Sequence, residues 1–246
     1  MNADENDLKR LKELQLDTLY YSSIVPVIVT LAGGFVLYYI LLDVSNTIAA
    51  ISWLTIFFIV SVIRIMVIRF YNISIKSPKR YDYWLNTFFA GVVCTGTLLG
   101  SLAYIFIIDQ DIINIGLLTM FILVVASGSI GIYSVYQRIY YGFNIPMLLP
   151  LIIFLLIQNN EQFNKLSIIL IAFTVCIFII QYYAHRAINQ LLIFKIKNNN
   201  MFDEHKVDQD RIKDLQGLNN SYTTQLTDTV SELRLCQEKL EQQHKH

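Results

Sequence analysis

Six long apolar segments separated by short polar ones account for most of the chain between residues 20 and 183. About 20 residues of α-helix cross the hydrocarbon core of a bilayer, so these segments have the length of transmembrane helices. They are Tyr20–Leu42, Thr47–Phe70, Leu85–Ile108, Ile112–Tyr136, Tyr141–Ile157 and Leu166–Tyr183. The fifth contains Pro146 and Pro150, which predict a kink or a break. The pattern predicts an all-α membrane protein with a six-helix transmembrane domain over residues 20–184.

Polar segments flank this domain on both sides. Residues 1–19 carry Leu8, Leu11 and Leu19 at helical spacing among charged residues, which predicts a short amphipathic helix at the cytoplasmic membrane surface. We interpret residues 185–246 as a cytoplasmic signalling helix.

The second polar segment has a heptad pattern. Its apolar seam positions are Ile212, Leu226, Leu233 and Leu240, with Val230 in the complementary place. This pattern predicts a parallel coiled coil, and therefore a homodimer formed through the tail. Asn219, Thr223 and Gln237 also occupy seam positions, and Gly217 costs about 1 kcal/mol relative to alanine in a helix. The tail should therefore pair only weakly, and needs the membrane part to bring two copies together.

Basic residues are unevenly distributed among the connections. Asp43–Asn46, Asp109–Asp111 and Gln158–Lys165 contain a single basic residue, Lys165. The segments on the opposite side carry more of them: Lys9, Arg10 and Lys12 in the leader, Arg69, Lys76, Lys79 and Arg80 in the second connection, Arg138 in the fourth, and Arg186, Lys195 and Lys197 at the exit of the sixth span. By the positive-inside rule, both termini lie in the cytoplasm. The outer connections are short, so we expect no external ligand-binding domain. A stimulus would be read inside the bilayer, from the membrane itself or from the cytoplasmic side.

Composition supports a membrane protein and narrows its function. Of 246 residues, 54% are hydrophobic and 15% are charged, against about 25% charged in soluble domains. The mean hydropathy is +0.47. The net charge of zero gives no support for a nucleic-acid partner. We find no catalytic motif and no metal-ligand spacing, and predict no catalytic centre, cofactor or metal site in this chain. Cys94, Cys176 and Cys236 are far apart, and we expect them to be small packing residues.

Arg64 is the main ionisable candidate inside a span, with Arg69 five residues later. Charged residues within membranes are costly and are functional candidates by default. Both arginines are close to the cytoplasmic end of the second span, so we expect their side chains to extend to the lipid headgroups. The spans have no acidic residue or histidine at mid-membrane, which argues against an ion-coupled transporter.

Aromatic residues gather near the span ends, as an interfacial belt requires. Tyr104, Tyr133, Trp53 and Thr119 could instead line an intramembrane pocket, and the sequence does not decide which helices they face.

Two groups of small residues predict close helix packing. Gly96 and Gly100 form a G-x-x-x-G motif, and Gly128 and Gly131 belong to a small-residue patch. Such residues let helices approach one another closely. The contact could be within one chain or at a dimer seam.

Three stretches carry a family resemblance. They are the basic connection Arg64–Arg80 followed by Trp84, Gly91 and Gly96, the proline-containing stretch Arg138–Pro150, and the exit Asn189–Leu192 leading through Lys197 into the heptad helix. This arrangement resembles the six-helix membrane input region of bacterial sensor proteins, which precedes diguanylate cyclase (GGDEF) domains, PAS domains or histidine kinase cores of two-component systems. The resemblance implies the bacterial inner membrane and dimeric signalling, but supplies no reaction. No GGDEF-like motif or kinase box is present, so we expect either the input portion of a longer receptor or a protein whose tail engages a cytoplasmic signalling partner.

The joint between membrane and tail, Tyr182–Lys197, is the predicted point of signal transmission, with Arg186, Leu191, Leu192 and Ile196 as its candidate residues. Our leading hypothesis is a sensory input and transmission module. The main alternative is a structural or adaptor protein that recruits a soluble partner through its tail. A small transporter or channel is a third possibility.

Overall fold

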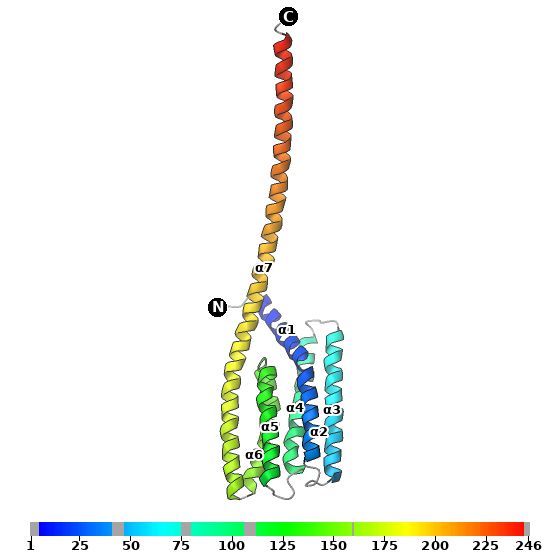
Figure 1. The fold of residues 1–246 in the computed structure, drawn as a ribbon, viewed down its shortest axis with the longest axis vertical. Coiled ribbons are helices and arrows are strands. Elements are labelled where there is room, and N and C mark those ends of the chain that lie inside the picture. The colour runs from blue at the N-terminus through cyan, green and yellow to red at the C-terminus, as the bar shows by residue number, and fades with distance from the viewer. Residues whose placement is uncertain (1–4, 41–46, 75–79, 106–111, 159, 244–246) are drawn as a thin grey trace. The chain divides into compact units, whose positions relative to one another are not determined.

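A computed structural model describes residues 5–40, 47–74, 80–105, 112–158 and 160–243. Within these ranges every regular element is a helix (Figure 1). The helices are α1 (Glu5–Ser22), α2 (Ile24–Ile40), α3 (Thr47–Ile73), α4 (Tyr81–Ile105), α5 (Ile112–Tyr133), α6 (Gln137–Ile157) and α7 (Glu161–Gln243). Six stretches of the described helices are long and apolar enough to cross a membrane, the first formed by α1 and α2 together. The predicted all-α class and the six candidate spans are confirmed, and the chain has the character of a multi-pass membrane protein.

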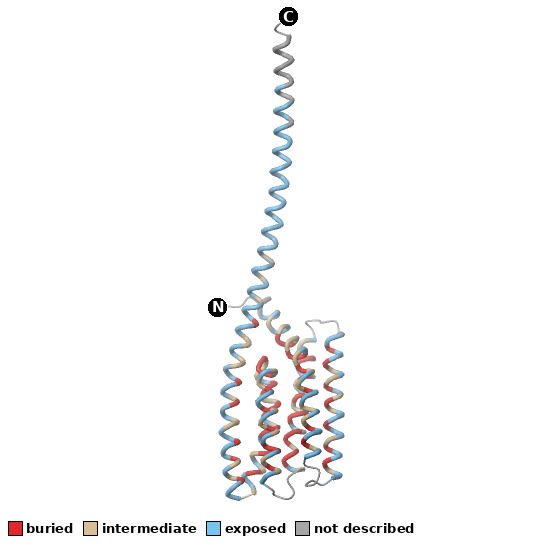
Figure 2. The backbone as a smooth tube through the Cα atoms, in the orientation of Figure 1, coloured by how far each residue is buried: buried red, intermediate tan, exposed pale blue. Residues whose placement is uncertain are grey.

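The chain divides into two compact units, Met1–Ile193 and Phe194–His246. The first is a helical bundle that contains α1 to α6 and the beginning of α7. The second contains the rest of α7. From Met201 onward, every described side chain of this second unit is exposed (Figure 2).

The closest helix packing in the bundle is between α4 and α6. Gly96 and Gly100 face α6, where added Cβ atoms would lie 2.4 Å from the carbonyl oxygen of Phe143 and 2.2 Å from that of Pro146. Pro150 has no N–H to donate back to the Pro146 carbonyl, so that oxygen is free to meet a neighbour. The two glycines therefore pack within one chain.

The helix α6 runs through both of its prolines. The break that we considered for the fifth span is absent, because α4 packs against the proline-containing turns and supports them.

The second small-residue patch, which contains Gly128 and Gly131, has different surroundings from Gly96 and Gly100. Cβ atoms at Gly128 and Gly131 would meet nothing within 4 Å among the described residues, so these glycines do not bring two helices of one chain together. A dimer seam at this patch stays a prediction. Cys94 and Cys176 are exposed rather than packed, and the side chain of Cys236 lies outside the described residues.

The N-terminal helix, which we predicted to lie at the membrane surface, has its last turns buried among the other helices. Leu19 and Tyr20, near the end of α1, are fully buried, whereas Leu8 is exposed. The Tyr20 hydroxyl donates to the carbonyl of Trp84 over 2.9 Å, and Tyr20 stacks on Tyr71 with ring centroids 3.8 Å apart. The last turns of α1 are therefore part of the core.

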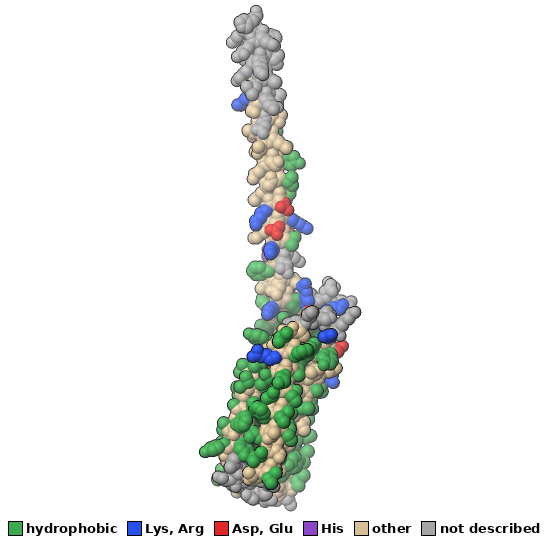
Figure 3. Space-filling model, turned by 90° about the vertical axis from the view of Figure 1, so that its right-hand side faces the viewer, with side chains coloured by type: hydrophobic (Ala, Val, Ile, Leu, Met, Phe, Trp, Pro, Cys, Tyr) green, Lys and Arg blue, Asp and Glu red, His purple; other side chains and the backbone are tan. Residues whose placement is uncertain are grey.

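The two ends of the bundle differ in their charged side chains. Lys and Arg side chains gather at one end of its apolar surface (Figure 3). The other end holds the exposed ion pair between Lys165 and Glu161, 2.7 Å apart. Asp43, Asp109 and Asp111, used to orient the chain, lie outside the described residues. The clustering agrees with the distribution on which the predicted orientation depends; the cytoplasmic side itself stays a prediction.

Candidate functional site

Arg64 lies inside the bundle, not at the headgroups. Its side chain is 8% exposed, so the predicted extension toward the membrane surface is wrong, whereas Arg69 is exposed. One terminal nitrogen, Nη1, donates to the Thr95 hydroxyl over 3.1 Å, and Nη2 donates to the Tyr133 hydroxyl over 3.2 Å. Gly91 lies beside the stem of this side chain, where an added Cβ would be 3.4 Å from Arg64 Cγ, an ordinary van der Waals distance. Arg64 thus joins α3 to α4 and α5.

The surroundings of Arg64 do not neutralise its charge. Its partners are two hydroxyl groups and the ring of Phe88, whose centroid is 5.9 Å from Cζ. No acidic residue in the described part of the chain forms an ion pair with it. A guanidinium stays charged in proteins, and a buried charge without a counter-charge costs several kcal/mol. The centre is therefore electrostatically incomplete and suited to attract an anion.

A groove of about 460 Å³ lies between α2 and α5, next to this centre. Val25 and Tyr133 line one end, and Gly33 and Phe121 line the other; its lining is mostly apolar. Of the four residues that we considered for an intramembrane pocket, Tyr133 does line this groove. The groove and the arginine centre therefore share one side chain, Tyr133.

The other three pocket candidates have different contacts. Trp53 Nε1 donates to the Leu98 carbonyl over 2.8 Å, and the Thr119 hydroxyl donates to the Ile115 carbonyl over 2.7 Å. Tyr104 is exposed and packs edge-on against Phe154. The contacts of Trp53 and Tyr104 join two helices, whereas that of Thr119 stays within α5. None of the three residues lines either groove described in this section.

A second polar pair lies beside the groove. Asn144 Nδ2 donates to the Ser129 hydroxyl over 2.8 Å, and Ser129 lines the groove. Asn144 is fully buried, and its Oδ1 has no hydrogen-bond partner in the structure. Buried polar atoms without a partner are uncommon and call for an explanation.

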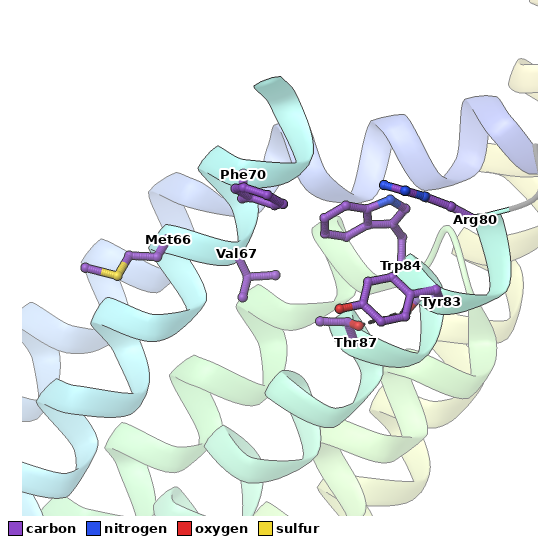
Figure 4. Close-up of a pocket in the computed structure, with 7 residues that line it drawn as sticks. All are labelled: Met66, Val67, Phe70, Arg80, Tyr83, Trp84 and Thr87. Atoms are coloured by element: carbon purple, nitrogen blue, oxygen red, sulfur yellow. Dashed lines mark hydrogen bonds between the residues drawn. The ribbon is translucent and has the colours of Figure 1, made fainter. Parts of the chain in front are cut away.

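A larger groove, of about 820 Å³, lies between the end of α3 and the start of α4. Figure 4 shows Phe70 and Met66 on α3, and Trp84, Tyr83 and Arg80 on the α4 side. Its only charged lining residue, Arg80, is exposed. Solvent or headgroups can therefore balance the charge of Arg80, which distinguishes it from Arg64.

The joint between bundle and tail is held by a chain of hydrogen bonds. Gln15 of α1 donates to Asn189 Oδ1 over 2.8 Å, and Asn189 Nδ2 contacts His185 Nε2 at 2.9 Å. His185 Nδ1 is 2.6 Å from the Ser134 carbonyl oxygen. A carbonyl can only accept, so Nδ1 carries the proton and Nε2 accepts from Asn189. This polar relay ties α7 both to α1 and to the turn between α5 and α6.

Of the residues that we predicted for signal transmission, Arg186, Leu191 and Leu192 are close to this relay in sequence but are not part of it, and Ile196 belongs to the second unit. Leu192 is buried, Leu191 is exposed and Ile196 is half-buried. Arg186 is exposed, with its Cζ 5.0 Å from the Tyr182 ring centroid. Sequence reasoning missed Gln15, His185 and Asn189 as a connected group. The signal that could have found part of it is the i, i+4 spacing of His185 and Asn189.

The bundle part of α7 buries only a narrow stripe. Its buried residues before the joint recur at intervals of three, four or seven: Phe163, Ser167, Leu170, Ile177 and Gln181. Gln181 is 0% exposed, yet neither of its side-chain polar atoms has a hydrogen-bond partner, and the fully buried Tyr140 hydroxyl also has none. Tyr140 packs on Phe178, one turn before Gln181. The contact between α6 and α7 therefore buries polar atoms that lack hydrogen-bond partners.

The predicted coiled-coil seam is exposed wherever the structure describes it. Ile212, Leu226 and Val230 all expose large apolar side chains. The side chains of Leu233 and Leu240 lie outside the described residues. In a single chain this seam has nothing to pack against.

No group of three or more His, Cys, Asp or Glu residues in the described part of the chain could hold a metal ion. No protein-family model matches this chain, and neither a curated protein nor a solved structure matches it.

Proposed function

We propose that the protein is a membrane sensory input and signal-transmission module. It would span the bacterial cytoplasmic membrane six times with both termini in the cytoplasm. A change of helix packing in the bundle would pass through α7 to a homodimeric coiled-coil tail, and from there to an output domain or a signalling partner.

The observation that carries this proposal is the poorly satisfied contact between α7 and the bundle. Each buried polar group without a hydrogen bond costs about 1–3 kcal/mol, and Gln181 and Tyr140 contribute three such atoms. Shifting or rotating α7 could pair these atoms with each other or with water. The contact therefore favours a second position of α7 close in energy to the first.

The hydrogen bonds of the polar relay stabilise the present position of α7 and oppose the penalty at Gln181. Its three hydrogen bonds each contribute about 0.5–1.5 kcal/mol, which is similar to the penalty at Gln181. Because these stabilising and destabilising energies are similar in size, a modest stimulus would be enough to shift α7 from one position to another. Because α7 is one helix from Glu161 to Gln243, movement at the relay would reach the tail without an intervening loop.

The test uses the full chain in membranes, with Cys94→Ala and Cys176→Ala so that Cys236 is the remaining cysteine. Cys236 is three residues after the seam position Leu233 and flanks the seam, so in two parallel tails a bifunctional thiol crosslinker can join its two copies. Crosslinking with such a reagent then reports tail pairing. Gln181→Leu removes the unpaired amide, and we expect it to change the crosslinking rate by about tenfold. Gln190→Leu, at an exposed position of the same helix, should leave the rate unchanged.

Two results would count against the proposal. Tails that never crosslink would contradict transmission through a dimer. Tails that crosslink equally in all variants would favour the adaptor alternative, in which the exposed tail recruits a soluble partner and α7 transmits nothing.

A further inference from the structure

We infer that the groove between α2 and α5 binds a long-chain carboxylic acid, with its carboxylate at Tyr133 and its charge balanced by Arg64. This inference concerns a ligand and holds whether or not α7 transmits a signal.

The first argument is the unbalanced charge of Arg64. The guanidinium is nine-tenths buried and makes two hydrogen bonds, both to neutral hydroxyl groups. Of its five N–H donors, several are therefore left for an anion. A carboxylate is the natural complement, because charge-assisted hydrogen bonds are about twice as strong as neutral ones.

Tyr133 connects this charge with the groove. Its hydroxyl oxygen accepts from Arg64, and the structure gives its own proton no acceptor among the described residues. Tyr133 also lines the groove. A carboxylate oxygen that accepts this proton at ordinary hydrogen-bond length would lie no more than about 6 Å from Arg64 Nη2. The tyrosine ring is held between Phe88 and Phe143, so the hydroxyl is well positioned.

The shape of the groove fits one alkyl chain. It extends along α2 from Val25 to Gly33, which is about 12 Å of helix. At the far end Phe121 packs over Gly33, because its Cε2 is 2.7 Å from where a Cβ of Gly33 would be. The groove therefore holds the carboxyl half of a long alkyl chain, and the rest of the chain would extend into the surrounding lipid. Pockets of about 300–1,000 Å³ hold a single small ligand, and 460 Å³ lies in this range.

Gly128 supplies an internal test of this assignment. It lines the groove, and a Cβ there would meet nothing within 4 Å. A large side chain at this position would therefore start into open space and extend into the groove. Gly131, about one helical turn later, also has free space around it but does not line the groove. The two positions form a matched pair.

The experiment measures binding of radiolabelled palmitate to the full chain in nanodiscs of neutral phosphatidylcholine, with empty nanodiscs as background. We expect saturable binding of one palmitate per chain, and at least tenfold weaker competition by methyl palmitate, which has no charge. Tyr133→Phe, which removes the donor and keeps the ring, should weaken binding about tenfold or more. Gly128→Leu should abolish binding, and Gly131→Leu should preserve it. Circular dichroism and gel filtration show that each variant is folded.

Three outcomes would overturn the inference. Methyl palmitate competing as well as palmitate would remove the role of the charge. Equal binding by the Gly128→Leu and Gly131→Leu variants would place the ligand elsewhere. Displacement of palmitate by equimolar phosphatidylglycerol would replace the single-chain acid with an anionic phospholipid.

Discussion

The helix α7 belongs to two different environments along its length. Between Glu161 and Ile193 it buries a narrow stripe against the bundle, and its exposed residues, such as Ile168 and Ile179, are apolar. After Phe194 it is polar overall, and its exposed apolar residues follow a heptad pattern. Exposed isoleucines in a candidate membrane span need only lipid to cover them. Exposed leucines on a polar helix leave apolar surface in water, which a second tail would cover if the proposed coiled coil forms.

The contrast also separates two kinds of polar residue. In the bundle, Gln181 is buried with no hydrogen-bond partner for its amide, and Arg64 is buried with two neutral hydroxyl partners. In the described part of the tail, polar side chains are exposed and solvated. Unsatisfied polar groups are costly only where water is excluded. The energetic cost of unsatisfied polar groups therefore falls on the bundle and not on the described part of the tail.

The largest effect should come from the tight contact within the bundle. Gly100→Val would place a Cβ 2.2 Å from the backbone carbonyl of Pro146, which cannot move without displacing α6. We expect a loss of about 3 kcal/mol or more of unfolding free energy, or no folded protein. Thermal unfolding in detergent measures it.

Two control glycines sharpen this test. Gly116→Val adds a side chain where nothing lies within 4 Å, and should cost less than about 1 kcal/mol. In the tail, Gly217→Ala should strengthen the helix by about 1 kcal/mol, because its surroundings are also empty. A Gly100→Val protein as stable as the Gly116→Val protein would contradict the close packing of α4 on α6.

An intermediate effect is expected in the tail. Leu226 is 68% exposed in a single chain, so Leu226→Ala should have little effect unless a partner covers it. In a coiled-coil dimer the same change should cost about 2–4 kcal/mol. Crosslinking through Cys236 in membranes would then fall at least tenfold, while Leu218→Ala, off the predicted seam, would leave it unchanged. Equal crosslinking in both variants would argue against a paired seam.

The smallest effect concerns the joint. His185→Ala removes the two central hydrogen bonds of the polar relay, which together are worth about 1–3 kcal/mol. We expect faster hydrogen exchange of backbone amides from residue 185 to residue 193, measured by mass spectrometry. His205→Ala, at an exposed position in the tail, serves as control. Unchanged exchange in the His185→Ala protein would mean that the relay does not hold α7.

Hydrophobic length was sufficient to predict the spans, because crossing a bilayer is a local property of 20 or so residues. Local reasoning also found the exposed apolar seam of the tail and the small residues at Gly96 and Gly100. It was wrong about Arg64, because the position of an arginine along one helix does not reveal its neighbours. Those neighbours, Thr95 and Tyr133, are 31 and 69 residues away in the chain.

The sequence by itself thus determined the helical class, the candidate spans and the change of character along α7, all of which depend on the order of apolar and polar residues. Only the tertiary structure showed that Gly128 lines a groove, whereas Gly96 packs tightly against α6. Both are small residues in apolar helices, so the sequence alone does not distinguish them. The tertiary structure likewise brought Gln15, Asn189, His185 and Ser134 together into one relay. The reason is that helix packing sets which faces meet, and the chemistry of each polar residue depends on the face opposite to it.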